Sequence, residues 1–96
     1  MRMVSQVHAA HILVKTEQEA RQLLEEIKAG KMDFAKAAQL KSLCPSGKKG
    51  GDLGWFGRGK MVREFEQAAF STSKGQIAGP FKTEFGWHIM KVLEVR

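Results

Sequence analysis

Two apolar segments at opposite ends of the chain constrain the fold more than any other feature. Gln6–Val14 reads Q-V-H-A-A-H-I-L-V and Trp87–Val95 reads W-H-I-M-K-V-L-E-V. Runs of this length, rich in β-branched and aliphatic residues, are typical of buried strands. Because 96 residues suit one domain, we expect both segments to share one sheet and to pair at its centre.

The residues after the first strand carry signals for a helix. Thr16 is the predicted N-cap, and Glu19 three residues later completes a capping-box pattern. Gly30 is the predicted C′ residue that ends the helix. Apolar residues between them recur at i, i+3, i+4 and i+7, which marks one buried helical face: Ala20, Leu23, Leu24 and Ile27.

Further elements follow along the chain. Asp33 is expected to cap a second helix whose inward residues are Phe34, Ala37, Ala38 and Leu40. Residues 42–51 hold Pro and three Gly and predict a loop. A short strand over 52–56, a helix over 62–70 and a short strand over 79–83 come next, with a turn at 85–86. This order indicates an α+β domain with an antiparallel sheet.

Composition excludes several classes of protein. Hydrophobic residues make up 43% and charged residues 27% of the chain, which fits an ordinary globular domain. No run of 18 apolar residues exists, so we expect no membrane span, and residues 1–8 lack a secretory signal pattern. Cys44 is the single cysteine, without a metal-ligand cluster around it. We therefore expect a cytoplasmic monomer that binds no metal.

The positive charge is concentrated in the middle third of the chain. The net charge is +6, and residues 31–63 carry eight basic residues against two acids, which accounts for all of it. Such a region attracts anionic partners over long range. One alternative function is therefore weak nucleic-acid binding through residues 31–63, although no RNA-binding aromatic signature or helix-turn-helix pattern accompanies the charge.

Four sequence blocks together resemble a known family. They are H-I-L-V-K at 11–15, C-P-S-G-K-K-G-G-D-L-G-W-F at 44–56, G-K-M-V-x-x-F-E-x-A-A-F at 59–70 and G-P-F-K-T-E-F-G-W-H-I at 79–89. In this order and at these separations they resemble the parvulin-type (PpiC, rotamase) peptidyl-prolyl cis/trans isomerases, particularly the small stand-alone forms. The resemblance implies one FKBP-like domain over 1–96, with a four-stranded antiparallel sheet surrounded by about four helices.

The implied reaction is rotation about Xaa-Pro bonds in unfolded or flexible polypeptides, in the service of protein folding. Amide resonance sets a barrier of roughly 18–20 kcal/mol, and no bond is made or cut. Catalysis therefore requires tighter binding of the twisted amide than of either planar state, and no cofactor is expected. The twisted amide is less polar than the planar one, which favours a mostly apolar pocket.

The resemblance assigns the substrate pocket to four apolar residues. Met61 and Phe65 are four apart on one helical face. With Leu53 they are implied to line the pocket for the proline ring, and Phe56 is implied to lie beside them. Met and Phe at helical spacing also fit plain core packing, and this alternative stays open on the sequence alone.

A polar set accompanies this pocket. His11 and His88 lie on the two predicted central strands, and a histidine inside an apolar strand must be hydrogen-bonded or uncharged. The resemblance makes them a facing pair, joined by the Thr83 hydroxyl, that influences a nearby thiol at Cys44. These four residues are the implied catalytic set. We expect Cys44 to be a polar group at the site and not a covalent nucleophile, because isomerisation needs no covalent intermediate.

Departures from the family pattern bear on the substrate. Phosphate-specific relatives carry an insertion with clustered Arg between the first strand and the first helix, whereas Lys15 and Thr16 connect them directly here. We expect no preference for phosphorylated substrates. A basic rim of Lys48, Lys49, Arg58, Lys60 and Arg63 is expected to favour acidic or neutral residues before proline. A peptide-binding module without catalysis remains the other alternative function.

Overall fold

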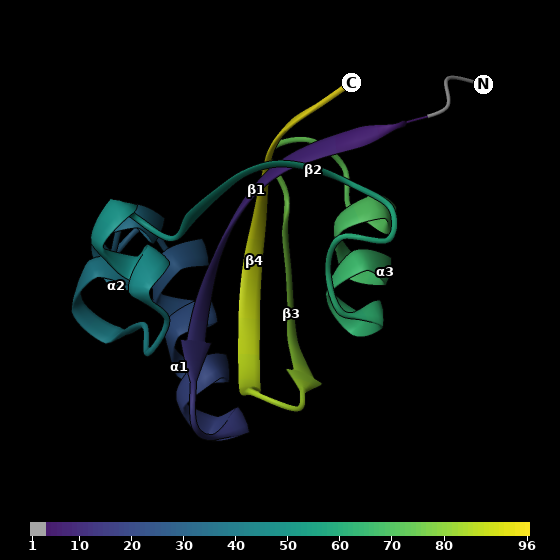
Figure 1. The fold of residues 1–96 in the computed structure, drawn as a ribbon. Helices are drawn as coiled ribbons and strands as arrows, with labels where there is room; N and C mark the ends of the chain where they lie inside the picture. Colours follow the sequence, from purple (N-terminus) through teal and green to yellow (C-terminus); the bar gives the residue numbers. More distant parts are fainter. Residues whose placement is uncertain (1–3) are drawn as a thin grey trace.

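In the computed structural model, which describes residues 4–96, four strands form one antiparallel sheet. The strands are β1 (Gln6–Val14), β2 (Asp52–Gly57), β3 (Ile77–Thr83) and β4 (Gly86–Val95), in the spatial order β2-β1-β4-β3. Figure 1 shows β1 and β4 side by side at the centre of this sheet. The prediction that the two terminal strands pair centrally is confirmed, and residues 1–3 lie outside the described part of the chain.

Helices cover both faces of the sheet. Helices α1 (Glu17–Lys28) and α2 (Phe34–Lys41) lie on one face and α3 (Arg63–Ser71) on the other (Figure 1). A short 3-10 helix, η1 (Pro45–Lys49), follows α2. Three α-helices and one 3-10 helix match the expected number of about four.

Strand alternation divides the core in two. Ala10, Ile12 and Val14 pack with α1 and α2, whereas Val7 and Ala9 pack with α3. His11 and Leu13 follow Val7 and Ala9 at a spacing of two, so the side chains of β1 that face α3 include His11. The α3 face of the sheet is therefore the face that carries the predicted site.

The predicted ends of the first two helices are confirmed. The Thr16 hydroxyl accepts a hydrogen bond from the Glu19 N–H at 3.2 Å. Gly30 has φ +77°, and the bonds from its N–H to the Ile27 carbonyl and from the Lys31 N–H to the Glu26 carbonyl form a Schellman motif. The Asp33 carboxylate accepts from the Lys36 N–H.

Some sequence predictions need correction. Leu40 is 62% exposed and not part of the core. At 3.6 residues per turn its side chain lies about a third of a turn from the stripe formed by Phe34, Ala37 and Ala38. Strand β3 begins at Ile77, earlier than the predicted start at Gly79, because Ile77 and Ala78 already pair with β4 before the ladder becomes irregular. Within residues 4–96, no helix has the length and hydropathy needed to cross a membrane.

Candidate active site

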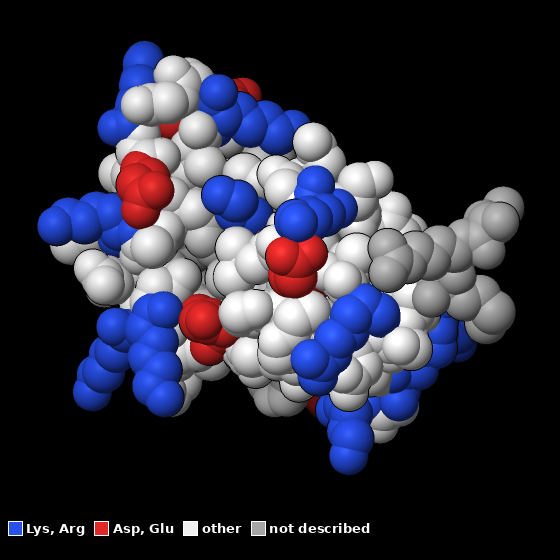
Figure 2. Space-filling model, turned by 90° about the horizontal axis from the view of Figure 1, so that it is seen from above, with Lys and Arg blue, Asp and Glu red and all other residues white. Residues whose placement is uncertain are grey.

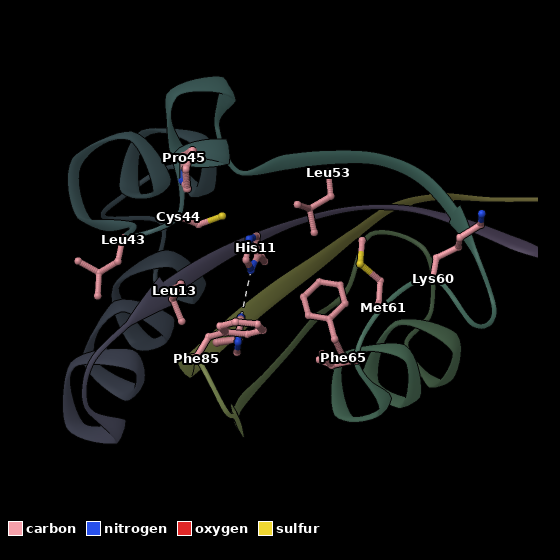
Figure 3. Close-up of a pocket in the computed structure, with 12 residues that line it drawn as sticks. His11, Leu13, Leu43, Cys44, Pro45, Leu53, Lys60, Met61, Phe65 and Phe85 are labelled. Carbon is pink, nitrogen blue, oxygen red and sulfur yellow. Dashed lines mark hydrogen bonds between the residues drawn. The ribbon is translucent and has the colours of Figure 1, made fainter.

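A cleft of about 450 Å³ opens on the α3 face of the sheet. Clefts of roughly 300–1,000 Å³ are typical of sites for small molecules and short peptide segments. The walls come from β1, the loop before η1, β2, the β2–α3 loop, α3, the β3–β4 turn and β4, as Figure 3 shows. The lining residues are His11, Leu13, Leu43, Cys44, Pro45, Leu53, Lys60, Met61, Val62, Phe65, Phe85 and His88.

An apolar cup forms one end of this cleft. Leu53, Met61 and Phe65 converge there, and Phe65 is only 4% exposed because it is seated on the core beneath it. The Phe65 ring contacts Phe81 and Phe56 at centroid distances of 5.8 and 5.9 Å. The structure thus brings together three of the four residues predicted to bind substrate.

Phe56 is the exception. It does not line the cleft and is 5% exposed. Its ring lies between Phe65 and Phe70 in the α3 core. Phe56 does lie beside Phe65, as expected, but its predicted place among the substrate-binding residues is corrected: in β2 the side chain of Leu53 lines the cleft, and Phe56 packs against Phe65 without reaching the cleft.

The two histidines, Thr83 and the following turn form one chain of hydrogen bonds. The Nδ1 atoms of His11 and His88 are 3.0 Å apart. The Thr83 Oγ1 lies 2.7 Å from His88 Nε2 and accepts the Phe85 N–H at 3.1 Å. Thr83 does not line the cleft, so it acts through His88, whereas His11 and His88 are part of the wall.

This chain has two neutral proton arrangements. If the Thr83 hydroxyl donates to His88 Nε2, then His88 Nδ1–H donates to His11 Nδ1, and His11 carries its proton on Nε2. In the reverse arrangement His11 Nδ1–H donates to His88 Nδ1, and His88 Nε2–H donates to the Thr83 hydroxyl oxygen. His11 Nε2 then carries no proton and can only accept a hydrogen bond. Among the described residues His11 Nε2 is buried without a hydrogen-bond partner in either case, which is unusual for a buried polar atom.

Burial keeps both imidazoles neutral near pH 7. Desolvation, with a smaller contribution from the charge of His88, lowers the pKa of His11 to about 4. Desolvation also lowers the pKa of His88. A neutral pair can donate and accept across the 3.0 Å Nδ1–Nδ1 contact, whereas two imidazolium ions would repel each other there.

Cys44 lines the cleft next to Pro45, and its side chain points toward His11 in Figure 3. Its sulfur accepts a hydrogen bond from the Ser46 hydroxyl at 3.3 Å. In residues 4–96 this hydroxyl, and not an imidazole, is the hydrogen-bond partner of the thiol. The thiol is therefore a weakly polar group in the wall, held in place by the first turn of η1.

His8 belongs to a different cluster. Its Nε2 lies 2.8 Å from Asp52 Oδ1, and its ring contacts Trp55. The Gly54 N–H, assisted by His8, holds the pKa of Asp52 below its usual range. Asp52 therefore pairs with His8 and not with His11.

Five apolar lining residues were not predicted as site residues: Leu13, Leu43, Pro45, Val62 and Phe85. Strand alternation from His11 was a sufficient signal for Leu13. Leu43 and Phe85 are 55% and 64% exposed, and a large apolar residue in a predicted loop or turn was the only signal for them. They extend the apolar surface past His11, on the side opposite Met61 (Figure 3).

Comparisons with known proteins agree with this geometry. A family model described as the PPIC-type PPIASE domain, or rotamase, matches residues 7–94. The chain belongs to the PPIC-type peptidyl-prolyl isomerase family. The predicted parvulin-like family, the α+β fold and the class of enzyme, a peptidyl-prolyl cis/trans isomerase domain, are confirmed.

Individual members of the PPIC-type family cover this chain almost completely. The foldase protein PrsA of Geobacillus sp. strain WCH70 is 49% identical over 89 residues, which are 92% of this chain and 32% of that protein. PrsA from Bacillus anthracis aligns with TM-score 0.93 at 37% identity over 98% of this chain and 43% of the other. NmPin, the parvulin of Nitrosopumilus maritimus, aligns with TM-score 0.84 at 41% identity over 94% of this chain and 97% of NmPin. The chain thus spans about a third of the length of the first PrsA relatives and nearly all of NmPin.

Proposed function

We propose that this protein accelerates rotation about Xaa-Pro bonds in extended or unfolded polypeptides and so assists their folding, without a metal or other cofactor. One observation carries the proposal: the apolar cup of Leu53, Met61 and Phe65 opens directly beside the neutral His11–His88 pair within one cleft. In this proposal the proline ring binds in the cup, and the rotating amide lies next to it, beside the two histidines.

The physical basis is differential binding of the twisted amide. Rotation removes the resonance between nitrogen and carbonyl, so the amide loses polarity as it twists. A cleft with mostly apolar walls and uncharged imidazoles disfavours the more polar planar states relative to the twisted one. The cup holds the ring of proline while the carbonyl side turns past His11 and Cys44.

We propose substrates without a phosphate group. Only two residues, Lys15 and Thr16, separate β1 from α1, and Lys60 is the one cation among the lining residues of the cleft in the described chain. A phosphoserine brings about two negative charges and is commonly held by clustered Arg. Of the basic rim expected from the sequence, Lys48, Lys49, Arg58 and Arg63 do not line the cleft.

Exchange NMR on Ala-Xaa-Pro-Phe peptides with catalytic amounts of protein tests the activity directly. Cis–trans cross-peaks are expected to appear with the wild type and to weaken at least tenfold in Met61→Ala. Met32→Ala is the matched control, because Met32 is also half-buried but packs with α1 and α2. Phosphorylated and unmodified Ser-Pro peptides in the same assay test the absence of phosphate preference.

The two alternative functions predict other results. Shifted protein resonances without accelerated exchange would indicate a peptide-binding module. Weak nucleic-acid binding through residues 31–63 would show steep salt dependence. Figure 2 shows Lys and Arg side chains over one face of the molecule with acidic side chains between them, a mixed pattern that gives this second candidate less support than the cleft gives the first.

We also propose that the protein acts as a monomer in the cytoplasm. The single cysteine, Cys44, is free, as is usual in a reducing compartment. Light scattering after size exclusion tests the oligomeric state. Fractionation of cells that express the native gene tests the location, and recovery in a membrane or extracellular fraction would overturn it.

A further inference from the structure

One wall of the cleft is a segment with few contacts of its own. Lys60, Met61 and Val62 are consecutive lining residues in the connection between β2 and α3. In the described chain the backbone groups of residues 58–61 make a single hydrogen bond, from the Gly59 N–H to the Glu66 Oε1. The backbone of this wall is therefore held by few hydrogen bonds, while the side chains of Met61 and Val62 pack against the core on the α3 face.

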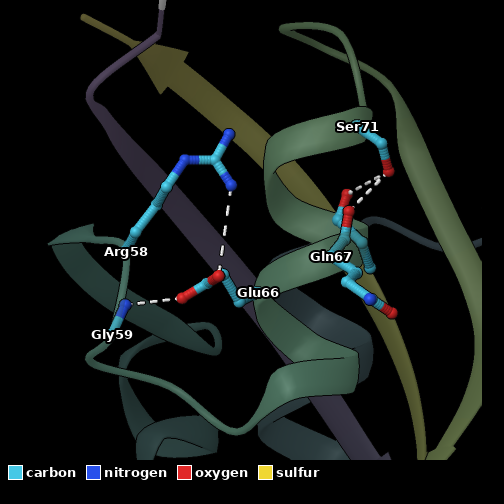
Figure 4. Close-up of polar contacts among 6 residues, drawn as sticks. Arg58, Gly59, Glu66, Gln67 and Ser71 are labelled. Atoms are coloured by element: carbon cyan, nitrogen blue, oxygen red, sulfur yellow. Dashed lines mark hydrogen bonds and ion pairs between the residues drawn. The ribbon is translucent and has the colours of Figure 1, made fainter.

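Glu66, the residue that follows Phe65 on α3, holds the segment. Its Oε1 accepts the Gly59 N–H at 2.5 Å, and its Oε2 lies 4.0 Å from Arg58 Nη1. Figure 4 shows both contacts converging on the one carboxylate. Glu66 is about three-quarters buried, since its side chain is 24% exposed. A largely buried carboxylate that accepts a backbone N–H makes a stronger hydrogen bond than a neutral acceptor would.

Arg58 adds a second attachment to the same helix. Its guanidinium lies 4.2 Å from the centroid of the Phe70 ring, within the range of a cation–π contact. Phe70 in turn packs against Phe56, which supports Phe65 at the base of the cup. The loop is thus attached at Glu66 and Phe70 to the helix that carries the opposite side of the cup.

From this arrangement we infer that Glu66 is a positioning residue for the isomerase reaction: through Gly59 and Arg58 it fixes the Lys60–Val62 wall against Phe65. The inference rests on the proposed isomerase function. Glu66 does not line the cleft, so it acts on the substrate only through the loop. A displacement of reacting groups by about 1 Å can lower a rate by up to two orders of magnitude, and loss of the single hydrogen bond permits such movement.

The test compares two substitutions of Glu66 by kcat/KM in the exchange assay. Glu66→Ala removes both contacts and is expected to lower kcat/KM about tenfold. Glu66→Gln keeps an oxygen that accepts from Gly59 and is expected to stay within about threefold of the wild type. Glu64→Ala is the control, because Glu64 is exposed on the same helix and, among the described residues, its carboxylate makes no hydrogen bond or ion pair with residues 58–61, and it is expected to leave kcat/KM unchanged.

Hydrogen exchange on the wild type tests the geometry independently of activity. The Gly59 amide is expected to be protected while the amides of Arg58, Lys60 and Met61 exchange freely. Equal exchange of all four amides would overturn the inference even if Glu66→Ala failed to fold. Wild-type kcat/KM in a folded Glu66→Ala, or equal losses in Glu66→Ala and Glu66→Gln, would overturn it as well. An inactive wild type with a protected Gly59 amide would instead count against the isomerase function.

Discussion

The imidazole rings of His11 and His88 lie against each other across the two central strands, with their Nδ1 atoms 3.0 Å and their centroids 5.2 Å apart. They are diagonal neighbours, because His11 pairs with Met90 and His88 with Leu13. Phe65 approaches both rings edge-on, at 5.4 and 5.8 Å. The same phenylalanine therefore covers the polar pair and forms part of the apolar cup.

The first prediction concerns the stability of the fold at acidic pH. Burial, then the charge of His88, lowers the pKa of His11 from 6.5 to about 4, so the unfolded chain binds protons between these values that the folded chain does not. Stability is therefore fully present above pH 6.5 and is lost as the pH falls through 4. For His11 the loss at pH 4.5 is roughly 2–3 kcal/mol. Urea unfolding at pH 7.5 and 4.5 measures it.

An NMR titration of the imidazole protons checks what lowers the pKa of His11. In His88→Asn the pKa of His11 should rise, because the charge of His88 is removed, but it should stay below 6.5 because burial is the larger cause. A midpoint near 6.5 for His11 in the wild type would contradict the account.

The second prediction concerns the Thr83 hydroxyl. Thr83→Val keeps the shape but leaves His88 Nε2 and the Phe85 N–H without their partner. The expected loss of stability is about 1–3 kcal/mol, with slower isomerisation because His88 and Phe85 both line the cleft. Thr83→Ser retains the hydroxyl and should therefore keep most of the stability and most of the isomerisation rate of the wild type. Equal thermal midpoints for the Val and Ser variants would count against a role for this hydrogen bond.

The third prediction concerns the residue before proline. Leu43 and Phe85 present exposed apolar surface at the end of the cleft opposite Met61. A Leu-Pro peptide should therefore be turned over faster than a Lys-Pro peptide, whose ammonium group gains nothing from an apolar surface. Phe85→Ala should reduce the Leu-Pro rate roughly fivefold, the effect of about 1 kcal/mol of lost apolar burial.

Leu40→Ala is the matched control for Phe85→Ala. Leu40 is exposed to a similar extent, 62% against 64%, but does not line the cleft. The Leu40→Ala substitution should therefore leave the rate with the Leu-Pro peptide unchanged. If Lys-Pro were the best substrate of the wild type, the third prediction would be wrong, and so would the preference for acidic or neutral residues expected from the sequence.

The fourth prediction concerns Gly51. It has φ +84°, and a Cβ there would lie 2.3 Å from the His11 carbonyl oxygen. The Gly51 carbonyl also accepts the His11 N–H at 2.9 Å. Gly51→Ala should therefore lower the free energy of unfolding by several kcal/mol. Gly54→Ala should cost only about 1–2 kcal/mol, because Gly54 has a similar φ of +74° with open space around it. Thermal unfolding of both variants measures the difference.

The fifth prediction separates Phe56 from the pocket residues. Phe56→Leu should reduce stability, because the side chain is buried between Phe65 and Phe70. Peptide affinity should stay within about twofold of the wild type, since Phe56 does not line the cleft. Affinity is measured by peptide titration followed by NMR. A tenfold loss of affinity without loss of stability would return Phe56 to the substrate pocket.

Much of the fold could be predicted because its determinants are local. The Thr16 cap and the Gly30 turn depend on residues within a few positions of each other, and the structure has both. The meeting of His11 and His88 was implied by the family resemblance and fits the central pairing of the two terminal strands. Phe56 and Leu40 were placed wrongly, because the face that a side chain presents at the end of a short element depends on packing against distant segments.

The sequence by itself determined the strands and helices, the central pairing of β1 and β4, and the residue types of an apolar cup beside two histidines. Periodicity, capping residues and strand alternation carry the information on strands and helices within short windows, whereas the cup and the facing histidines were implied by the resemblance to the parvulin-type isomerases. Only the tertiary structure decided that Leu43 and Phe85 extend the cleft, that Ser46 holds the Cys44 thiol and that Glu66 fixes the wall at Met61. These contacts depend on where loops lie in space, and loop positions are set by the register of the sheet and the packing of α3 on it.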